Sequence, residues 1–151
     1  MLEKNFYLCF RQWGVISLLL AIALKSASQT NIDSLSALLN KPAHDTVKLK
    51  LLVDLSEECE PTDIYKYGQP AVILADKLLA DKRTLNRKLI LQRKALALNN
   101  IGYLYEQRGQ IKIALNYYSR SLKIREKIQD KVGIGESYNN IGNTYKNQGK
   151  N

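Results

Sequence analysis

The chain has 151 residues, of which 45% are hydrophobic and 25% charged, so its length and composition fit a single globular domain. Its 23 basic and 14 acidic residues give a net charge of +9, which favours acidic partners or anionic surfaces but says nothing about the fold. Three prolines are too few for a long proline-rich linker.

The first 28 residues have the layout of a secretory signal peptide. Lys4 and Arg11 precede an apolar stretch, 15–24, and small residues follow it. Ten helical residues rise only about 15 Å, half of a bilayer core of ~30 Å. We therefore expect residues 1–28 to be cleaved and the protein to be exported. A lysine just before the cleavage region favours the alternative, an uncleaved anchor in the inner membrane.

Apolar residues then recur every three or four positions, and no stretch alternates strictly, so the sequence predicts an all-α fold. Short turns make consecutive helices antiparallel neighbours. Pro61 should end one helix, Gly109 should end another, and Pro70 should kink or break a third. The expected helices are a short one ending at Leu39, followed by 45–60, 63–79, 84–108, 110–129 and 130–149.

The chain offers little for catalysis or metal binding. After cleavage Cys59 is the one cysteine, best explained as a small apolar residue on a helix face. His44 is the single histidine, and it is the one candidate base for a serine or cysteine nucleophile. Four carboxylates cluster, but their spacing spreads them around a helix and its turn: Glu57, Glu58, Glu60 and Asp63. We expect no catalytic residue, no metal and no cofactor.

An internal repeat organises the second half. Residues 99–109, NNIGYLYEQRG, return forty positions later as NNIGNTYKNQG at 139–149. Self-similarity at a fixed period indicates stacked helix–turn–helix units. Gly102 and Gly142 lie inside helices, where glycine costs about 0.8–1 kcal/mol relative to alanine. We therefore expect a neighbouring helix to approach both glycines too closely for a side chain.

These residues resemble the tetratricopeptide repeat family in order and spacing. One full repeat is carried by Leu98, Ile101, Gly102, Tyr105, Gly109, Ala114, Tyr118 and Ser121, and its first part returns at Ile141, Gly142 and Tyr145. Serine replaces the family's second alanine, the closing proline is absent, and the period is 40 rather than ~34 residues. The resemblance implies antiparallel helix hairpins stacked as a short α-solenoid.

The resemblance also implies a division of the chain after the signal or anchor helix at 1–28. A helical lead-in, a degenerate unit with an extension, a full repeat and a half repeat are expected at 29–48, 49–94, 95–134 and 135–151. The half repeat has no second helix, so we expect the array to be truncated there. Its exposed apolar surface would then permit self-association. The alternative is that its polar last helix caps the array itself.

In this family, peptides lie along a groove lined by the first helix of each unit, so the resemblance implies a protein or peptide partner. The matching groove positions are Asn99, Tyr103, Glu106, Gln107, Asn139, Asn143, Lys146 and Asn147. Any one of them is equally well explained as a solvated surface residue. The whole layout is similar to the exported sensor regions of bacterial signalling proteins, in which a periplasmic array precedes a membrane helix and a histidine kinase or DNA-binding domain. This resemblance implies a periplasmic location and a sensing or scaffolding role in signal transduction.

A basic stretch supports an alternative function, the binding of nucleic acid or of an anionic membrane surface. It contains Arg83, Arg87, Lys88, Arg93 and Lys94. Acidic residues are interspersed elsewhere, and a signal peptide would remove the protein from the cytoplasm. We therefore expect no nucleic acid as a partner, and membrane contact only through an uncleaved N-terminal segment.

Overall fold

The computed structural model describes residues 29–148, which contain helices and turns and no strand. The predictions of a signal peptide or anchor lie outside the described residues, as does Gly149. The chain divides into two units, Met1–Ser34 and Leu35–Asn151. Of the first unit, only residues 29–34 are described, and they are helical. Across the described residues, no helix combines the length and the apolar character needed to cross a membrane.

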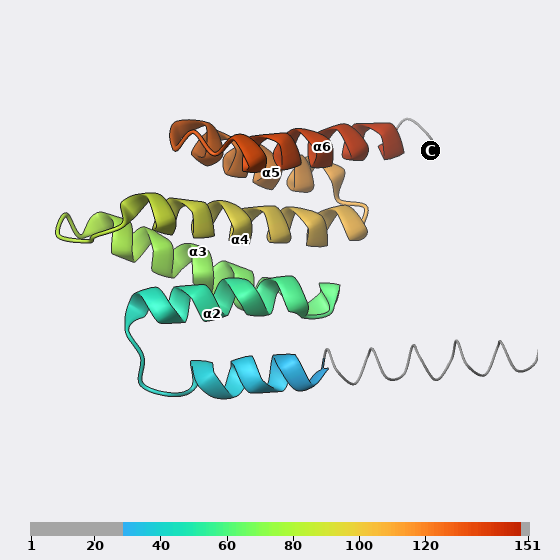
Figure 1. Cartoon of the computed structure of the whole chain (residues 1–151). Coiled ribbons are helices and arrows are strands. Elements are labelled where there is room, and N and C mark those ends of the chain that lie inside the picture. Colours follow the sequence, from blue (N-terminus) through green and yellow to red (C-terminus); the bar gives the residue numbers. More distant parts are fainter. Residues whose placement is uncertain (1–28, 149–151) are drawn as a thin grey trace, which may run out of the picture. The chain divides into compact units, whose positions relative to one another are not determined.

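In the second unit, consecutive helices are joined by short turns and lie antiparallel in layers (Figure 1). They are α2 (Asp45–Glu58), α3 (Ile64–Ala80), α4 (Arg87–Gln107), α5 (Ile111–Lys127) and α6 (Lys131–Gln148), with a 3₁₀ turn, Pro61–Asp63, before α3. Each helix packs against its neighbours in sequence, and α2 also contacts α4. The predicted all-α arrangement of stacked helical hairpins is confirmed.

The main hydrophobic core lies between α2, α3 and α4. Its buried members are Leu49, Leu52, Val53, Ala71, Val72, Ala75, Ile90, Ala97, Leu98 and Ile101. Fully burying one aliphatic side chain of this kind contributes about 1.5–3 kcal/mol. Gly68 permits the close contact of α3 with α4, because a Cβ there would lie 3.0 Å from Ile101 Cγ1.

The turns that end α4 and α5 have the same geometry, and they reverse the chain direction. Gly109 has φ of 69°, and the next N–H donates to Tyr105 O at 2.8 Å. Gln129 has φ of 57°, and the next N–H donates to Arg125 O at 2.9 Å. This pattern closes a helix by satisfying carbonyls of its last turn. Asp130 then caps α6, since its Oδ1 accepts from Gly133 N–H at 3.1 Å.

Pro70 lies inside α3, which continues through it to Ala80. Of the two expectations for this residue, a kink or a break, the break is therefore wrong. Proline removes the donor to the carbonyl of Lys66, and both residues are exposed, so water can satisfy that carbonyl. The fourth helix begins at Arg87 rather than at position 84, because Asn86 adopts a left-handed conformation with φ of 56°.

Candidate functional site

In the hairpin of α4 and α5, an aromatic ring of one helix packs directly on a glycine of the other. A Cβ on Gly102 would lie 2.7 Å from two ring atoms of Tyr118, so only glycine fits without displacement. Tyr118 is 1% exposed, and its hydroxyl donates to Glu106 Oε2 at 2.7 Å. Burial and the neighbouring carboxylate raise the pKa of Tyr118. The predicted close approach at Gly102 is confirmed. The hydroxyl of the Tyr118 ring that packs there holds the Glu106 carboxylate in place.

The remaining contacts of this hairpin also match the repeat pattern. Tyr105 and Tyr117 stack with ring centroids 5.5 Å apart and an interplanar angle of 9°. Ser121 Oγ donates to Ala95 O at 2.7 Å, and Ala114 is fully buried. Small residues at these positions let the two helices pack closely, as the sequence predicts.

The corresponding prediction for Gly142 is wrong. A Cβ at Gly142 would meet nothing within 4 Å, and Tyr145 is 58% exposed. The reason is that, among the described helices, only α5 packs extensively against α6, and it covers the opposite face. The repeat therefore preserves the residue types on α6 without preserving the contact that they make on α4.

A hollow of about 330 Å³ lies between α4, α5 and α6. It is lined by Tyr103, Glu106, Gln107, Tyr118, Asn140, Asn143, Lys146 and Asn147. Six of these eight residues are predicted groove positions, which the fold brings together from two helices forty residues apart. Their role in binding stays a prediction.

The other two predicted groove residues do not line the hollow. Asn99 Oδ1 accepts from Asn140 Nδ2 at 2.8 Å, and so connects α4 to α6. Asn139 lies on α6 with its Oδ1 3.5 Å from Asn143 Nδ2. A parallel contact joins α2 to α4, where Asn100 Nδ2 donates to Ser56 Oγ at 2.9 Å. Asparagines thus connect successive first helices along this face.

The chemistry of the hollow is mainly that of amides. Glu106 and Lys146 are its two charged groups, and they are opposite in sign. Four carboxamides offer both donors and acceptors, which match the N–H and C=O groups of an extended peptide. Tyr103, 43% exposed, supplies an aromatic surface at the edge. This set of groups can recognise a polypeptide backbone, and it includes no candidate nucleophile paired with a base.

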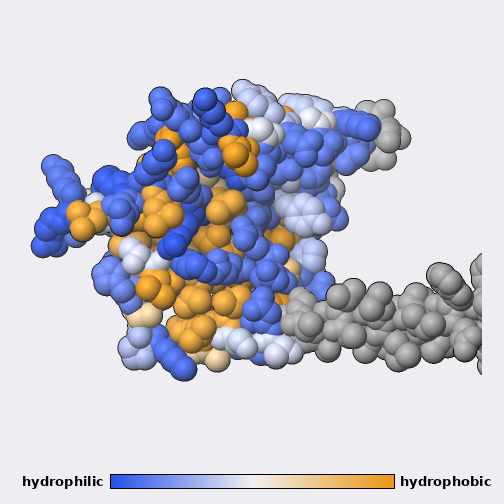
Figure 2. Space-filling model, in the orientation of Figure 1, coloured by the Kyte–Doolittle hydropathy of each residue, from blue (hydrophilic) through white to orange (hydrophobic). Residues whose placement is uncertain are grey.

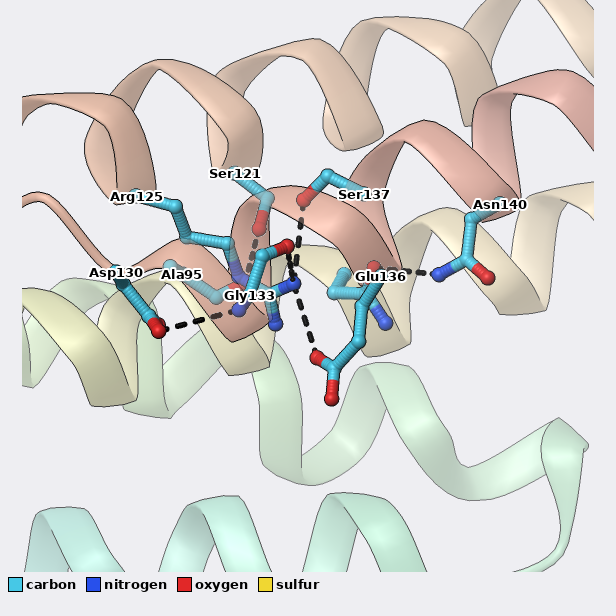
Figure 3. Close-up of polar contacts among 9 residues, drawn as sticks. Ala95, Ser121, Arg125, Asp130, Gly133, Glu136, Ser137 and Asn140 are labelled. Atoms are coloured by element: carbon cyan, nitrogen blue, oxygen red, sulfur yellow. Dashed lines mark hydrogen bonds and ion pairs between the residues drawn. The ribbon is translucent and has the colours of Figure 1, made fainter.

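Arg125 is a positioning residue that the sequence analysis missed. It is 2% exposed, and its Nη1 donates to Gly133 O and to Ser137 Oγ, the latter at 3.2 Å (Figure 3). The same nitrogen lies 3.1 Å from Glu136 Oε2. Arg125 thereby attaches the start of α6 to α5. The sequence signal for its burial is its position on the buried face of α5, seven positions after Tyr118.

The basic stretch at 83–94 is largely used within the fold. Its cations contact neighbouring carboxylates and carbonyls: Arg83 with Asp81, Arg87 with Leu79 O, Arg93 with Thr46 O and Lys94 with Asp76. The last three of these contacts join α4 to α3 or to α2, whereas the first lies within the turn after α3. The alternative of a nucleic-acid or membrane surface therefore gains no support.

A second, larger hollow of about 960 Å³ lies beside this stretch, between the start of α2, the turn after α3 and the start of α4. Apolar and basic side chains share its lining, among them Val47, Leu85, Leu89, Arg83 and Arg93. Figure 2 shows hydrophobic side chains at the surface over α2 and α4. Sequence analysis missed this hollow because its lining comes from three separate segments.

The cysteine and the acidic cluster have ordinary environments. Burial raises the pKa of the Cys59 thiol to about 11, with nearby Asp63 as the second cause. Burial also raises the pKa of Glu57. In the part of the chain that the structure describes, no three histidine, cysteine or acidic side chains stand close enough to hold a metal ion.

Comparison with known families bears on the same part of the chain as the groove. Residues 93–151 match the family model of the tetratricopeptide repeat. The match spans the predicted full and half repeats, and with them most of α4 and all of α5 and α6. No curated protein and no solved structure matches the chain significantly. A tetratricopeptide-type repeat is thus present, and it supports a protein–protein interaction module.

Proposed function

We propose that this chain binds a protein or peptide along the face of α4 and α6, with the hollow between them as its centre. The observation that carries the proposal is that Tyr103, Gln107, Asn143 and Asn147 converge on one hollow inside a tetratricopeptide-type repeat. Carboxamides on two helices can pair with the backbone of an extended segment. Because the hollow is small and open, binding is expected to be weak and to need several contacts.

The test is binding of a displayed peptide library to the 151-residue chain. Peptides selected on the wild type should lose affinity for the double variant Asn143→Ala with Asn147→Ala, which removes two amides from the hollow. The matched control is Asn116→Ala with Ser119→Ala, which trims two exposed positions of α5 outside the hollow. Equal binding by both double variants would rule out the hollow as the site.

We further propose that the module acts in the periplasm as the sensing part of a bacterial signal-transduction protein, and that copies associate through α6. The support for export is the charged, apolar and small-residue order of positions 1–28. The intact mass of protein from a periplasmic extract tests it. A mass that lacks residues 1–28 supports export, whereas a chain with Met1 intact in the cytosol contradicts it.

A further inference from the structure

One face of α4 is covered by the helix that follows it in the repeat. Ala95, Leu98 and Gly102 are buried, and Tyr105 is half-buried. The covering helix is α5, which places the Tyr118 ring on Gly102 and stacks its other tyrosine on Tyr105. A tyrosine lying on a glycine is therefore the way in which this sequence closes two helices against each other.

The same face returns forty residues later on α6 without a cover. Its residues are Gly135, Tyr138, Gly142 and Tyr145, here called the outer stripe. Their spacing of three, four and three places them on one side of a helix. Tyr138 is 57% exposed and Tyr145 is 58% exposed, while a Cβ on either glycine would meet nothing within 4 Å.

We propose that the outer stripe is the contact between two copies of this chain, with their α6 helices antiparallel. The stripe is complementary to itself, because its two tyrosine–glycine pairs share residue 140 as their midpoint. An antiparallel pair in that register sets Tyr138 on the partner subunit's Gly142 and Tyr145 on the partner subunit's Gly135. Each contact then repeats that of Tyr118 on Gly102.

This register satisfies what a two-fold interface requires, namely that one surface patch fit a second copy of itself. Four tyrosines would be covered, each with an apolar ring over a glycine and a hydroxyl at the edge. None of the four stripe positions carries a charge, so the +9 chains meet at an uncharged strip. One helix per subunit makes a small interface, well under ~1,200 Å², so the dimer should be weak and reversible. The inference rests on the proposed association of copies through α6, and it does not depend on the groove binding a peptide.

Sedimentation of the full chain across a wide concentration range is the first experiment. The expected result is a reversible monomer–dimer equilibrium that tightens as salt screens the repulsion between two basic chains. Monomer at every concentration and salt would overturn the proposal. If a synthetic peptide of residues 111–127 binds the outer stripe of such a monomer, the stripe takes a second-helix partner instead.

The decisive variant is Gly142→Ala, which adds a Cβ where the partner's Tyr138 ring must lie. It should weaken dimerisation about tenfold or more, a loss equivalent to about 1.4 kcal/mol. Circular dichroism checks that α6 stays folded. Ser119→Ala, which also ends in a methyl side chain but lies at an exposed position of α5 outside both the outer stripe and the hollow, should leave the equilibrium unchanged. A dimer equally strong in both variants would overturn the tyrosine–glycine register, whereas library peptides should bind Gly142→Ala as they bind the wild type.

Discussion

At the scale of single residues, Gly102 and Gly142 occupy equivalent repeat positions yet differ in what surrounds them. Gly102→Ala should destabilise the fold by about 1–3 kcal/mol, because the added Cβ must displace the buried Tyr118 ring. Gly142→Ala should stabilise the monomer by up to about 1 kcal/mol, because alanine favours helix and the site is open. Urea unfolding at low protein concentration measures both. Changes of the same sign would contradict the packing described for these helices.

Cys59 allows a test of burial that uses pH. A thiol whose pKa is raised to about 11 has roughly 100-fold less thiolate at pH 8 than one at the usual value near 9. Thiolate is the reactive form, so alkylation of folded Cys59 should be slower than that of the unfolded chain by about this factor. The measurement is iodoacetamide labelling in buffer and in urea, with Cys9→Ser to remove the other thiol. Equal rates in the two solvents would contradict it.

At the scale of elements, Arg125 connects α5 to α6, so its loss should act on α6 alone. Arg125→Met keeps much of the side-chain volume but removes the charged donor to Gly133 O and the Ser137 hydroxyl. Loss of a hydrogen bond to a charged group costs about 1.5–3 kcal/mol, which predicts roughly 10- to 150-fold faster hydrogen exchange in α6. Arg120→Met is the control, because Arg120 is an exposed arginine of the same helix, over the ring of Tyr117. Exchange faster in α2 as well would show that Arg125 stabilises the whole fold.

The elements also show what a sequence can predict and where it stops. Helical periodicity and the glycine at 109 were enough to place α5 and its turns, because those signals depend on neighbours along the chain. The start of α4 could not be placed in this way, because Asn86 adopts a left-handed φ within the turn that precedes it.

The same limit applied to the candidate site. Six of the predicted groove positions line one hollow, because the repeat maps one helix onto the next. The hydrogen bond from Asn140 to Asn99 was not predicted. It depends on which of the adjacent asparagines, Asn139 or Asn140, faces α4. Gly142 was misjudged because its expected neighbour was inferred from Gly102, and a repeat predicts residue types but not the presence of a covering helix.

At the scale of the whole molecule, helices that contact mainly their neighbours in sequence should differ in local stability. The α4 helix packs on α3 and α5 and also touches α2, whereas α6 packs mainly on α5. Hydrogen exchange should therefore be slowest in α4 and fastest in α6, rather than uniform as in a fully cooperative bundle. Mass spectrometry of exchanged peptides at low protein concentration measures the gradient, and equal protection of α2 to α6 would contradict it. If two chains associate through the outer stripe, raising the concentration should slow exchange in α6 of the wild type, and should do so much less in Gly142→Ala, because only the wild-type stripe can receive the partner's tyrosine.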